Sequence, residues 1–338
     1  MKRLRRWSCG ILHCVLALAV AAPAAAEVST VRVARQYGIG YLQMVVMERQ
    51  RLIERHASAA GLGDVTIVWN TIADPAAGND AMLAGDVDFV AGGLGSFATL
   101  WDRTRATLGV KGVAALDSMP MLLNTRDPSI RSILDLKPEH RIAIPGVKVS
   151  SQATTLQFAA AQAFGNDEWQ RLDRLTVGMS HPTGMQALLS ERSEIAAHFT
   201  SPPYQNEELR RGGVHTILDS YDVWGGPQTF ILAWTTARFR TDNPTLYRAF
   251  LEALRDATAF VNAHLHEAAA LYVSATGDRT TSVERLAAML GDPKLKFTLV
   301  PQNVVKFVQF KARIGNVRTP PESWKDLFFP EIHDLPGS

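Results

Sequence analysis

The stretch AGDVDFVAGGLGSFATLWDRT, residues 84–104, contains the unit from which the fold is built. A strand is predicted over residues 87–91, where a short apolar run is bounded by glycine-rich turns. A helix is predicted over residues 97–104, and residues 92–96, Gly-Gly-Leu-Gly-Ser, form the turn between them. A strand, a glycine-rich turn and a helix in this order indicate an α/β fold.

The same alternation runs through the first two thirds of the chain in two blocks. In the first block, strands are predicted at 31–34, 65–69, 87–91 and 112–116, with helices at 41–59, 79–83 and 97–104. In the second, strands are predicted at 141–144, 172–177, 195–199 and 214–218, with helices at 151–164, 184–190 and 203–210. From residue 243 onward the pattern is almost continuously helical. The alternation indicates largely parallel sheets with helices on both faces.

Two α/β blocks and a helical C-terminal third predict a molecule with two lobes. Residues 116–123 and 221–234 are expected to cross between the lobes as the two strands of a hinge. Lobe 1 is then discontinuous, with residues 27–121 and 223–338, and lobe 2 consists of residues 122–222. Lobes linked in this way commonly close around a ligand. A continuous pair of domains is the structural alternative.

The first 26 residues have the composition of a secretory signal peptide. A basic segment, residues 1–6, precedes a short apolar stretch, and Ala24-Ala25-Ala26 offers a cleavage site of small residues. We expect export with cleavage near Ala26; an uncleaved membrane anchor is the alternative. Both cysteines, Cys9 and Cys14, lie in this segment, so the mature chain would have no disulfide, thiolate metal site or cysteine nucleophile.

Removal of this segment also changes the sign of the net charge. The whole chain has 35 Lys and Arg against 33 Asp and Glu, a formal net charge of +2. The segment 1–26 contains four of the basic residues and none of the acids, so 31 basic residues then face 33 acids, a net charge of −2. No basic field remains that would indicate nucleic acid or an anionic membrane as a partner. No other segment is apolar enough to span a bilayer, so we expect a soluble protein in an extracytoplasmic space.

The turns at the strand ends supply the candidate ligand site. Ligands of open α/β sheets bind where helices begin beyond the strands, glycine allows close approach of the backbone, and helix N-termini attract anions. The candidate ligand-binding residues are Gln36, Tyr37, Gly93, Leu94, Gly95, Ser96, Pro145, Ser150, Ser151, His181 and Thr200, with Trp224 of the return crossover as an aromatic wall. For each serine, a helix cap without any ligand is the alternative.

The sequence shows no catalytic constellation. Neither paired carboxylates nor a Ser/His/Asp set is evident. His264 and His266 are two apart on a predicted helix, so they do not share a face and are interpreted as a solvated pair. We therefore expect no metal, no cofactor and no enzymatic activity.

Several motifs, in their order along the chain, resemble the periplasmic substrate-binding proteins of ABC importers in the nitrate/sulfonate/taurine branch. They are Val31-Arg32-Val33 with Gln36-Tyr37-Gly38, then residues 84–90, 133–137, 184–191 with 195–199, 243–269 and 324–331. The resemblance implies a type II periplasmic binding protein fold, with two α/β lobes joined by a two-strand hinge and a ligand between them. It also implies a periplasmic location and an ABC permease of the inner membrane as partner.

Two segments depart from the family pattern. Residues 199–204 read FTSPPY, where the family usually has a tryptophan and an acid. Because that loop faces the cleft, the departure bears on the identity of the ligand. Residues 137–140 read KPEH in place of the usual glycine turn, which we interpret as a surface change.

The leading interpretation is a binding protein that captures a small organic anion and delivers it to the permease. A sulfonate or a taurine-like molecule is the first expectation, because N–H and hydroxyl donors suit its oxygens, and a carboxylate would be served equally well. A pyrimidine precursor of thiamine is a further alternative ligand. From other classes, a ligand-sensing co-receptor is an alternative, whereas an enzyme resembling the thiamine-pyrimidine synthase is disfavoured by the lack of cysteine. We expect a monomer.

Overall fold

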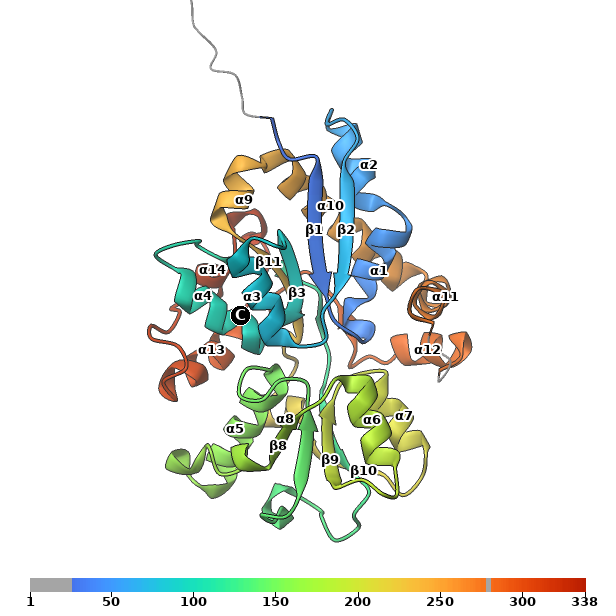
Figure 1. Ribbon diagram of the computed structural model, residues 1–338, viewed down its shortest axis with the longest axis vertical. Coiled ribbons are helices and arrows are strands. Elements are labelled where there is room, and N and C mark those ends of the chain that lie inside the picture. The colour runs from blue at the N-terminus through green and yellow to red at the C-terminus, as the bar shows by residue number, and fades with distance from the viewer. Residues whose placement is uncertain (1–25, 278–280) are drawn as a thin grey trace, which may run out of the picture.

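The computed structural model describes residues 26–277 and 281–338, which form two lobes, each built on one sheet (Figure 1). The predicted signal peptide lies outside the described residues, apart from Ala26. In the described ranges, no helix combines the length and the apolar character needed to cross a membrane.

The sheet of lobe 1 has five strands in the order β2-β1-β3-β11-β4. Their bounds are β1 Thr30–Arg35, β2 Thr66–Thr71, β3 Phe89–Gly93, β4 Lys111–Ala115 and β11 Ile231–Thr235. Strand β1 pairs in parallel with β2 and β3, whereas β11 runs antiparallel to both β3 and β4. A strand from the last third of the chain therefore completes the sheet formed by the first third.

The sheet of lobe 2 also has five strands, in the order β10-β6-β9-β7-β8. Their bounds are β6 Leu122–Thr125, β7 Arg141–Ile144, β8 Thr176–Gly178, β9 Ile195–Thr200 and β10 His215–Asp219. Strand β7 is parallel to β8 and β9, and β6 is antiparallel to β9 and β10. A separate short ladder joins β5 Asp117–Ser118 to β12 Lys296–Phe297.

Helices cover both sheets. Their bounds are α1 Leu42–Arg49, α2 Leu52–Ala59, α3 Pro75–Ala84, α4 Leu94–Thr104, α5 Ser151–Phe164, α6 His181–Leu189, α7 Tyr204–Arg210, α8 Ser220–Trp224, α9 Ala237–Asp242, α10 Pro244–Ala263, α11 Leu265–Thr276, α12 Val283–Leu290, α13 Val304–Arg313 and α14 Trp324–Leu327. Helix α10 packs on α1 and α2, and Phe250 of α10 stacks on Phe89 of β3 with ring centroids 3.9 Å apart. The C-terminal helices thus belong to the core of lobe 1.

The two crossovers between the sheets are hydrogen-bonded to each other. The Ser118 hydroxyl lies 2.9 Å from the Tyr221 hydroxyl and donates to the Gln228 carbonyl at 2.8 Å. The Phe230 N–H donates to the carbonyl of Asp117 at 3.3 Å. All strands of the first sheet lie within 30–115 or 231–235, and those of the second within 122–219. On this basis we propose the lobe boundaries expected from the sequence, 27–121 with 223–338 and 122–222.

The expectation of largely parallel sheets is correct for the βα units and incomplete for β6 and β11. Each of these strands enters its sheet directly from a crossover, without a preceding helix on that sheet, and runs antiparallel to its neighbours. A parallel neighbour needs a long crossover connection, which neither strand has.

The prediction of one helix over residues 41–59 is wrong. The segment forms a 3-10 turn at Ile39–Tyr41 followed by α1 and α2. The break lies at Arg51, whose φ of 53° is left-handed, and the Arg51 N–H donates to the carbonyl of Glu48 instead of continuing the helix. The predicted strand at 172–177 is likewise a 3-10 turn, Asp173–Leu175, followed by β8.

Gly112 offers a test of how the C-terminal segment is packed on lobe 1. The Phe329 N–H donates to the Gly112 carbonyl at 2.9 Å, and a methyl group on Gly112 would enter the ring of Phe328, which is fully buried. We expect Gly112→Ala to lower the free energy of unfolding by about 1–3 kcal/mol, because a packed aromatic ring must move. Urea denaturation measures this loss. Gly63→Ala meets no atom within 4 Å and should be close to neutral; equal losses in the two variants would contradict the packing described.

Candidate functional site

A small cavity lies between the lobes where α4 and α5 begin. The residues that line it are Gln36, Tyr41, Pro75, Gly93, Ser96, Pro145, Ser150, Ser151, Gln152, His181, Phe230 and Ile231. Its volume is about 10 Å³, which is roughly the space that one water needs. The lobes are therefore closed on each other in this structure.

The N-termini of α4 and α5 meet directly across the seam. The Gly95 N–H of α4 donates to the Ser151 hydroxyl of α5 at 3.1 Å. A Cβ atom at Gly95 would lie 2.7 Å from the carbonyl carbon and oxygen of Ser150, and one at Gly93 would lie 2.8 Å from the Ser151 hydroxyl. Glycine at both positions is therefore what allows the two helix ends to approach so closely. A second contact crosses the seam where the Ile39 N–H donates to the Pro202 carbonyl at 3.2 Å.

The serines of the site have local partners, and their neighbour Gln152 lacks one. Ser150 caps α5 by accepting the Ala153 N–H at 3.1 Å, and the Ser96 hydroxyl donates to the Gly93 carbonyl at 2.9 Å. Ser150 is therefore a helix cap, whereas the Ser151 hydroxyl takes part in a hydrogen bond between the lobes. Gln152 is 2% exposed, and its Nε2 has no hydrogen-bond partner among the described residues. An N–H donor without an acceptor therefore lies beside the two helix ends.

His181 begins α6 and closes one side of the cavity as a neutral imidazole. Its Nδ1 lies 2.7 Å from the Thr200 hydroxyl, and its ring stacks on Tyr204 with centroids 5.7 Å apart. Burial, together with a smaller effect of nearby His198, lowers the pKa of His181 to about 3. The side chain is therefore uncharged at neutral pH, and Thr200 fixes the orientation of its ring.

Part of the predicted site lies at this cavity. Of the predicted residues, the structure brings together Gln36, Gly93, Ser96, Pro145, Ser150, Ser151 and His181. It adds Tyr41, Pro75, Gln152, Phe230 and Ile231, which were not among the predicted site residues. Gln152 follows two serines in the first turn of a helix, and this pattern in the sequence could have indicated a site residue. Phe230 and Ile231 reach the cavity from the return crossover, and nothing in their local sequence indicates this.

Four other predicted residues lie close to the cavity without lining it. Tyr37 is 41% exposed, whereas Leu94 is fully buried in lobe 1. Gly95 contacts Ser150 and Ser151 at the seam, and Thr200 lies behind His181.

The expected aromatic wall at Trp224 is a misassignment. Its indole N–H donates to the Thr155 hydroxyl at 3.0 Å, and its ring stacks on Phe158 with centroids 4.4 Å apart. Trp224 is 1% exposed because α8 packs on α5, and the residue belongs to the hydrophobic core.

Gly95→Ala tests whether contact between the lobes requires a residue without a side chain at position 95. Alanine favours the helix, so lobe 1 should stay folded, but the new methyl would meet the Ser150 backbone and hold the lobes apart. We expect a larger radius of gyration in small-angle X-ray scattering and a melting temperature that does not fall. Gly78→Ala of α3 is the matched control, because its Cβ would make an ordinary contact 3.5 Å from Val90. An unchanged radius in Gly95→Ala would contradict the closed contact.

The buried imidazole of His181 makes stability depend on pH. The unfolded chain binds a proton at this group near pH 6.5, whereas the folded chain binds it only near pH 3, so its contribution to stability falls as the pH drops through this range. The slope from one such group is about 1.4 kcal/mol per pH unit.

We expect His181→Gln to reduce the loss of stability between pH 6.5 and 4, measured as the free energy of unfolding in urea. His266→Gln, at an exposed position, should keep the wild-type slope. Identical slopes in all three proteins would show that His181 is not held neutral.

A comparison of the sequence with models of known families gives no match, nor does a comparison with curated proteins. Comparison of the structures does give matches. The alkanesulfonate-binding protein SsuA from Xanthomonas axonopodis pv. citri, bound to MOPS, matches with a TM-score of 0.67 at 17% identity, over 88% of this chain and 96% of that chain. The aliphatic sulphonate binding protein SsuA from Escherichia coli matches with a TM-score of 0.64 at 17% identity, over 90% and 92% of the two chains.

The periplasmic nitrate-binding protein NrtA from Synechocystis PCC 6803 matches with a TM-score of 0.66 at 12% identity, over 91% of this chain and 86% of that chain. At these identities the likeness concerns the fold alone. The structural neighbours are binding proteins of the group that the sequence motifs resemble. The chain therefore has the type II periplasmic binding protein fold, with two α/β lobes joined by a two-strand hinge.

Proposed function

We propose that this chain is the solute-binding component of an ABC-type importer, and that it captures a small organic anion between its two lobes. The proposal places it in the periplasm, after cleavage of the N-terminal segment near Ala26, as a monomer that delivers its ligand to a permease of the inner membrane. The ligand site consists of the helix N-termini at the seam.

The observation that carries this proposal is the pair of helix N-termini facing one seam. Each N-terminus bears a partial positive charge, and two such ends close together favour an anion between them. Among the described residues that line the cavity, none has an acidic side chain that would oppose the anion. The Gly95 N–H and the Gln152 Nε2 are donors that an anionic oxygen would accept from, and in the closed structure the Ser151 hydroxyl takes the Gly95 N–H.

The size of the cavity requires movement of the lobes. A volume of about 10 Å³ is too small for any organic ligand, so the lobes must separate to admit one. The hinge at the two crossovers is the element that permits this separation. With a ligand bound, the anion would accept the Gly95 N–H in place of the Ser151 hydroxyl, and that hydroxyl would be free to donate a hydrogen bond to the anion.

A neighbouring groove supports an organic anion rather than an inorganic one. It lies beside the cavity, shares Pro145 with it, and has a volume of about 420 Å³. Its walls come from both lobes. They include the apolar residues Ala73, Ala76, Val147, Val149 and Met179, and one acidic residue, Asp74, whose carboxylate accepts the Ala76 N–H. Apolar walls next to an anion site suit a ligand with a short hydrocarbon tail. A sulfonate or taurine-like molecule and a carboxylate both meet this description, and the sulfonate is the first candidate.

Stabilisation by ligands tests the proposal. A molecule that binds only the folded protein raises the melting temperature. We expect 1-butanesulfonate to raise it more than methanesulfonate, because the longer tail reaches the apolar groove. The same assay includes taurine, butyrate, nitrate and an aminopyrimidine. A shift with butyrate or the pyrimidine and none with any sulfonate would overturn the sulfonate assignment, and no shift with any anion would overturn the function.

Ser151→Ala tests the site itself. We expect the dissociation constant of the stabilising anion to rise about tenfold, the order expected for loss of one hydrogen bond to a charged group. Calorimetric titration measures it. Thr236→Ala, which removes the cap of α9 at the end of lobe 1 away from lobe 2 (Figure 1), should lower stability and leave affinity unchanged. A fall in stability with unchanged affinity in Ser151→Ala would return Ser151 to a purely structural role.

A further inference from the structure

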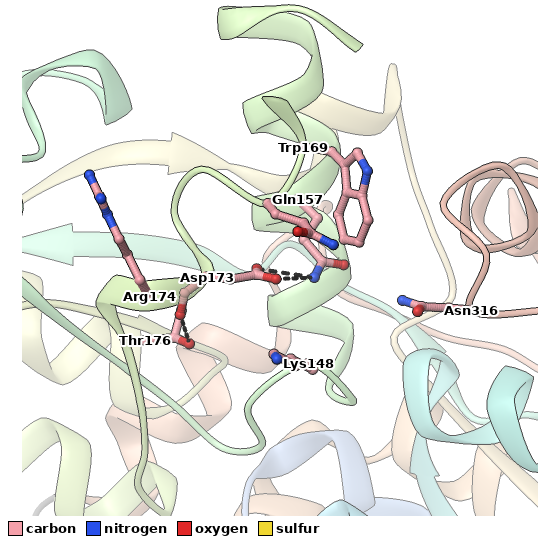
Figure 2. A pocket seen from close by; sticks show the side chains of 8 residues that line it. Lys148, Gln157, Trp169, Asp173, Arg174, Thr176 and Asn316 are labelled. Carbon is pink, nitrogen blue, oxygen red and sulfur yellow. Dashed lines mark hydrogen bonds between the residues drawn. The ribbon is translucent and has the colours of Figure 1, made fainter. Parts of the chain in front are cut away.

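A second and larger pocket opens on another part of the interlobe surface. Its volume is about 590 Å³, within the range of small-molecule sites. Lobe 2 contributes Lys148, from the loop before α5, Gln157 of α5, and Trp169 and Asp173 from the segment after α5. Asn316, from the loop after α13, comes from the other side of the pocket, as Figure 2 shows. The pocket therefore has walls from both halves of the molecule.

One end of the pocket is a set of hydrogen-bond acceptors. Gln157 is 1% exposed, and its Nε2 donates to both carboxylate oxygens of Asp173 at 3.0 Å. Its Oε1 has no hydrogen-bond partner among the described residues. Burial raises the pKa of Asp173 despite the Gln157 hydrogen bonds and the nearby charge of Lys148, so its present partners do not fully compensate the carboxylate charge. Among the described residues, no positively charged side chain donates a hydrogen bond to the Asp173 carboxylate.

The other groups of the pocket complement that end. Trp169 is half-buried, and its ring lies beside Gln157, where it offers an aromatic face to a cation (Figure 2). Lys148 is exposed and, within the described part of the chain, forms no ion pair. Asn316 adds an amide that can donate a hydrogen bond. Arg174 also lines the pocket, but Figure 2 shows its side chain pointing away from the other labelled groups.

We propose that this pocket is a second ligand site, distinct from the seam cavity, and that it binds a small zwitterion with a primary ammonium and a carboxylate. The ammonium donates to the Asp173 carboxylate and to the Gln157 Oε1 and lies against the face of Trp169. The carboxylate accepts from Lys148 and Asn316. A single ligand of this class would supply the acceptors and donors that both ends of the pocket lack. The site does not depend on which anion the seam takes.

The experiment uses amino acids of graded length and single-charge analogues. Glycine, β-alanine, γ-aminobutyrate and 5-aminovalerate are titrated by calorimetry, with butylamine and butyrate as controls that keep one charge each. We expect saturable binding by at least one zwitterion, with a dissociation constant at least about tenfold below those of butylamine and butyrate. Absence of binding by all four zwitterions, or equal binding by either single-charge analogue, would overturn the proposal.

Two variants place the binding in this pocket. Asp173→Asn and Lys148→Gln should each raise the dissociation constant of the zwitterion about tenfold or more, because each removes one charge-assisted partner. Lys148 is exposed, so Lys148→Gln carries little risk to folding. Asp167→Asn, at an exposed position on the preceding 3-10 turn, should leave the constant unchanged.

The seam variant Ser151→Ala separates the two sites. We expect it to leave zwitterion binding unchanged while it weakens binding of the anion at the seam. Zwitterion binding that is lost in Ser151→Ala and retained in Asp173→Asn would assign the ligand to the seam and overturn the second site. A change in fluorescence on binding that disappears in Trp169→Phe would support it.

Discussion

The backbones of α4 and α5 are in direct contact where the two helices begin, and the closed arrangement of the lobes depends on this contact. Gly93 and Gly95 have no side chains to keep the Ser150 and Ser151 region of lobe 2 away. Two helix N-termini brought together in this way repel each other, because both bear partial positive charge. The Ser151 hydroxyl, which accepts the Gly95 N–H at 3.1 Å, relieves only part of this repulsion. The closed seam therefore has an intrinsic preference for an acceptor with more negative charge than a hydroxyl.

The two crossovers of the hinge are hydrogen-bonded to each other. The Ser118 hydroxyl of the first crossover is hydrogen-bonded to the Tyr221 hydroxyl and to the Gln228 carbonyl of the second, so the two crossovers are joined into one strip. Asp117, next to it, is fully buried, and its Oδ1 accepts the Ile231 N–H at 3.3 Å. Burial raises the pKa of Asp117 well above the usual range, which favours the uncharged carboxyl group in this strip. An uncharged Asp117 lets this strip exclude water next to the seam cavity.

The sequence predicts the βα units because their signals are local. An apolar run, a glycine turn and a helix start lie within some twenty residues of one another, as in residues 84–104. Strand direction is not local: β6 and β11 are antiparallel because of the path of the chain across the hinge. The break at Arg51 has no glycine or proline to announce it. The break follows from packing, because α1 and α2 both contact α10, a helix that is distant in the sequence.

The candidate site likewise contains some residues that local sequence predicts and others that it does not. Ser150, Ser151 and His181 are predictable because helix starts have a characteristic local composition. Phe230 and Ile231 are not, since the return crossover brings them to the cavity from a distant part of the sequence. The sequence around Trp224 resembles a hinge turn because two glycines, Gly225 and Gly226, follow it.

Gly225, with φ of 80°, ends α8, and the buried side of that short helix contains Trp224.

Both proposed sites span the two lobes, and this has a thermodynamic consequence. The seam cavity lies between α4 and α5, and the outer pocket has Asn316 on one side and Lys148 on the other. An occupant that contacts both sides of either site binds one arrangement of the lobes better than another, and a ligand shifts an equilibrium by its difference in affinity for the two states. Because such coupling is reciprocal, each site must change the affinity of the other by the same factor. Among the described residues that line the larger pocket, only Asn316 lies outside lobe 2, so we expect an occupant of that pocket to shift the equilibrium between lobe arrangements less than a ligand at the seam does.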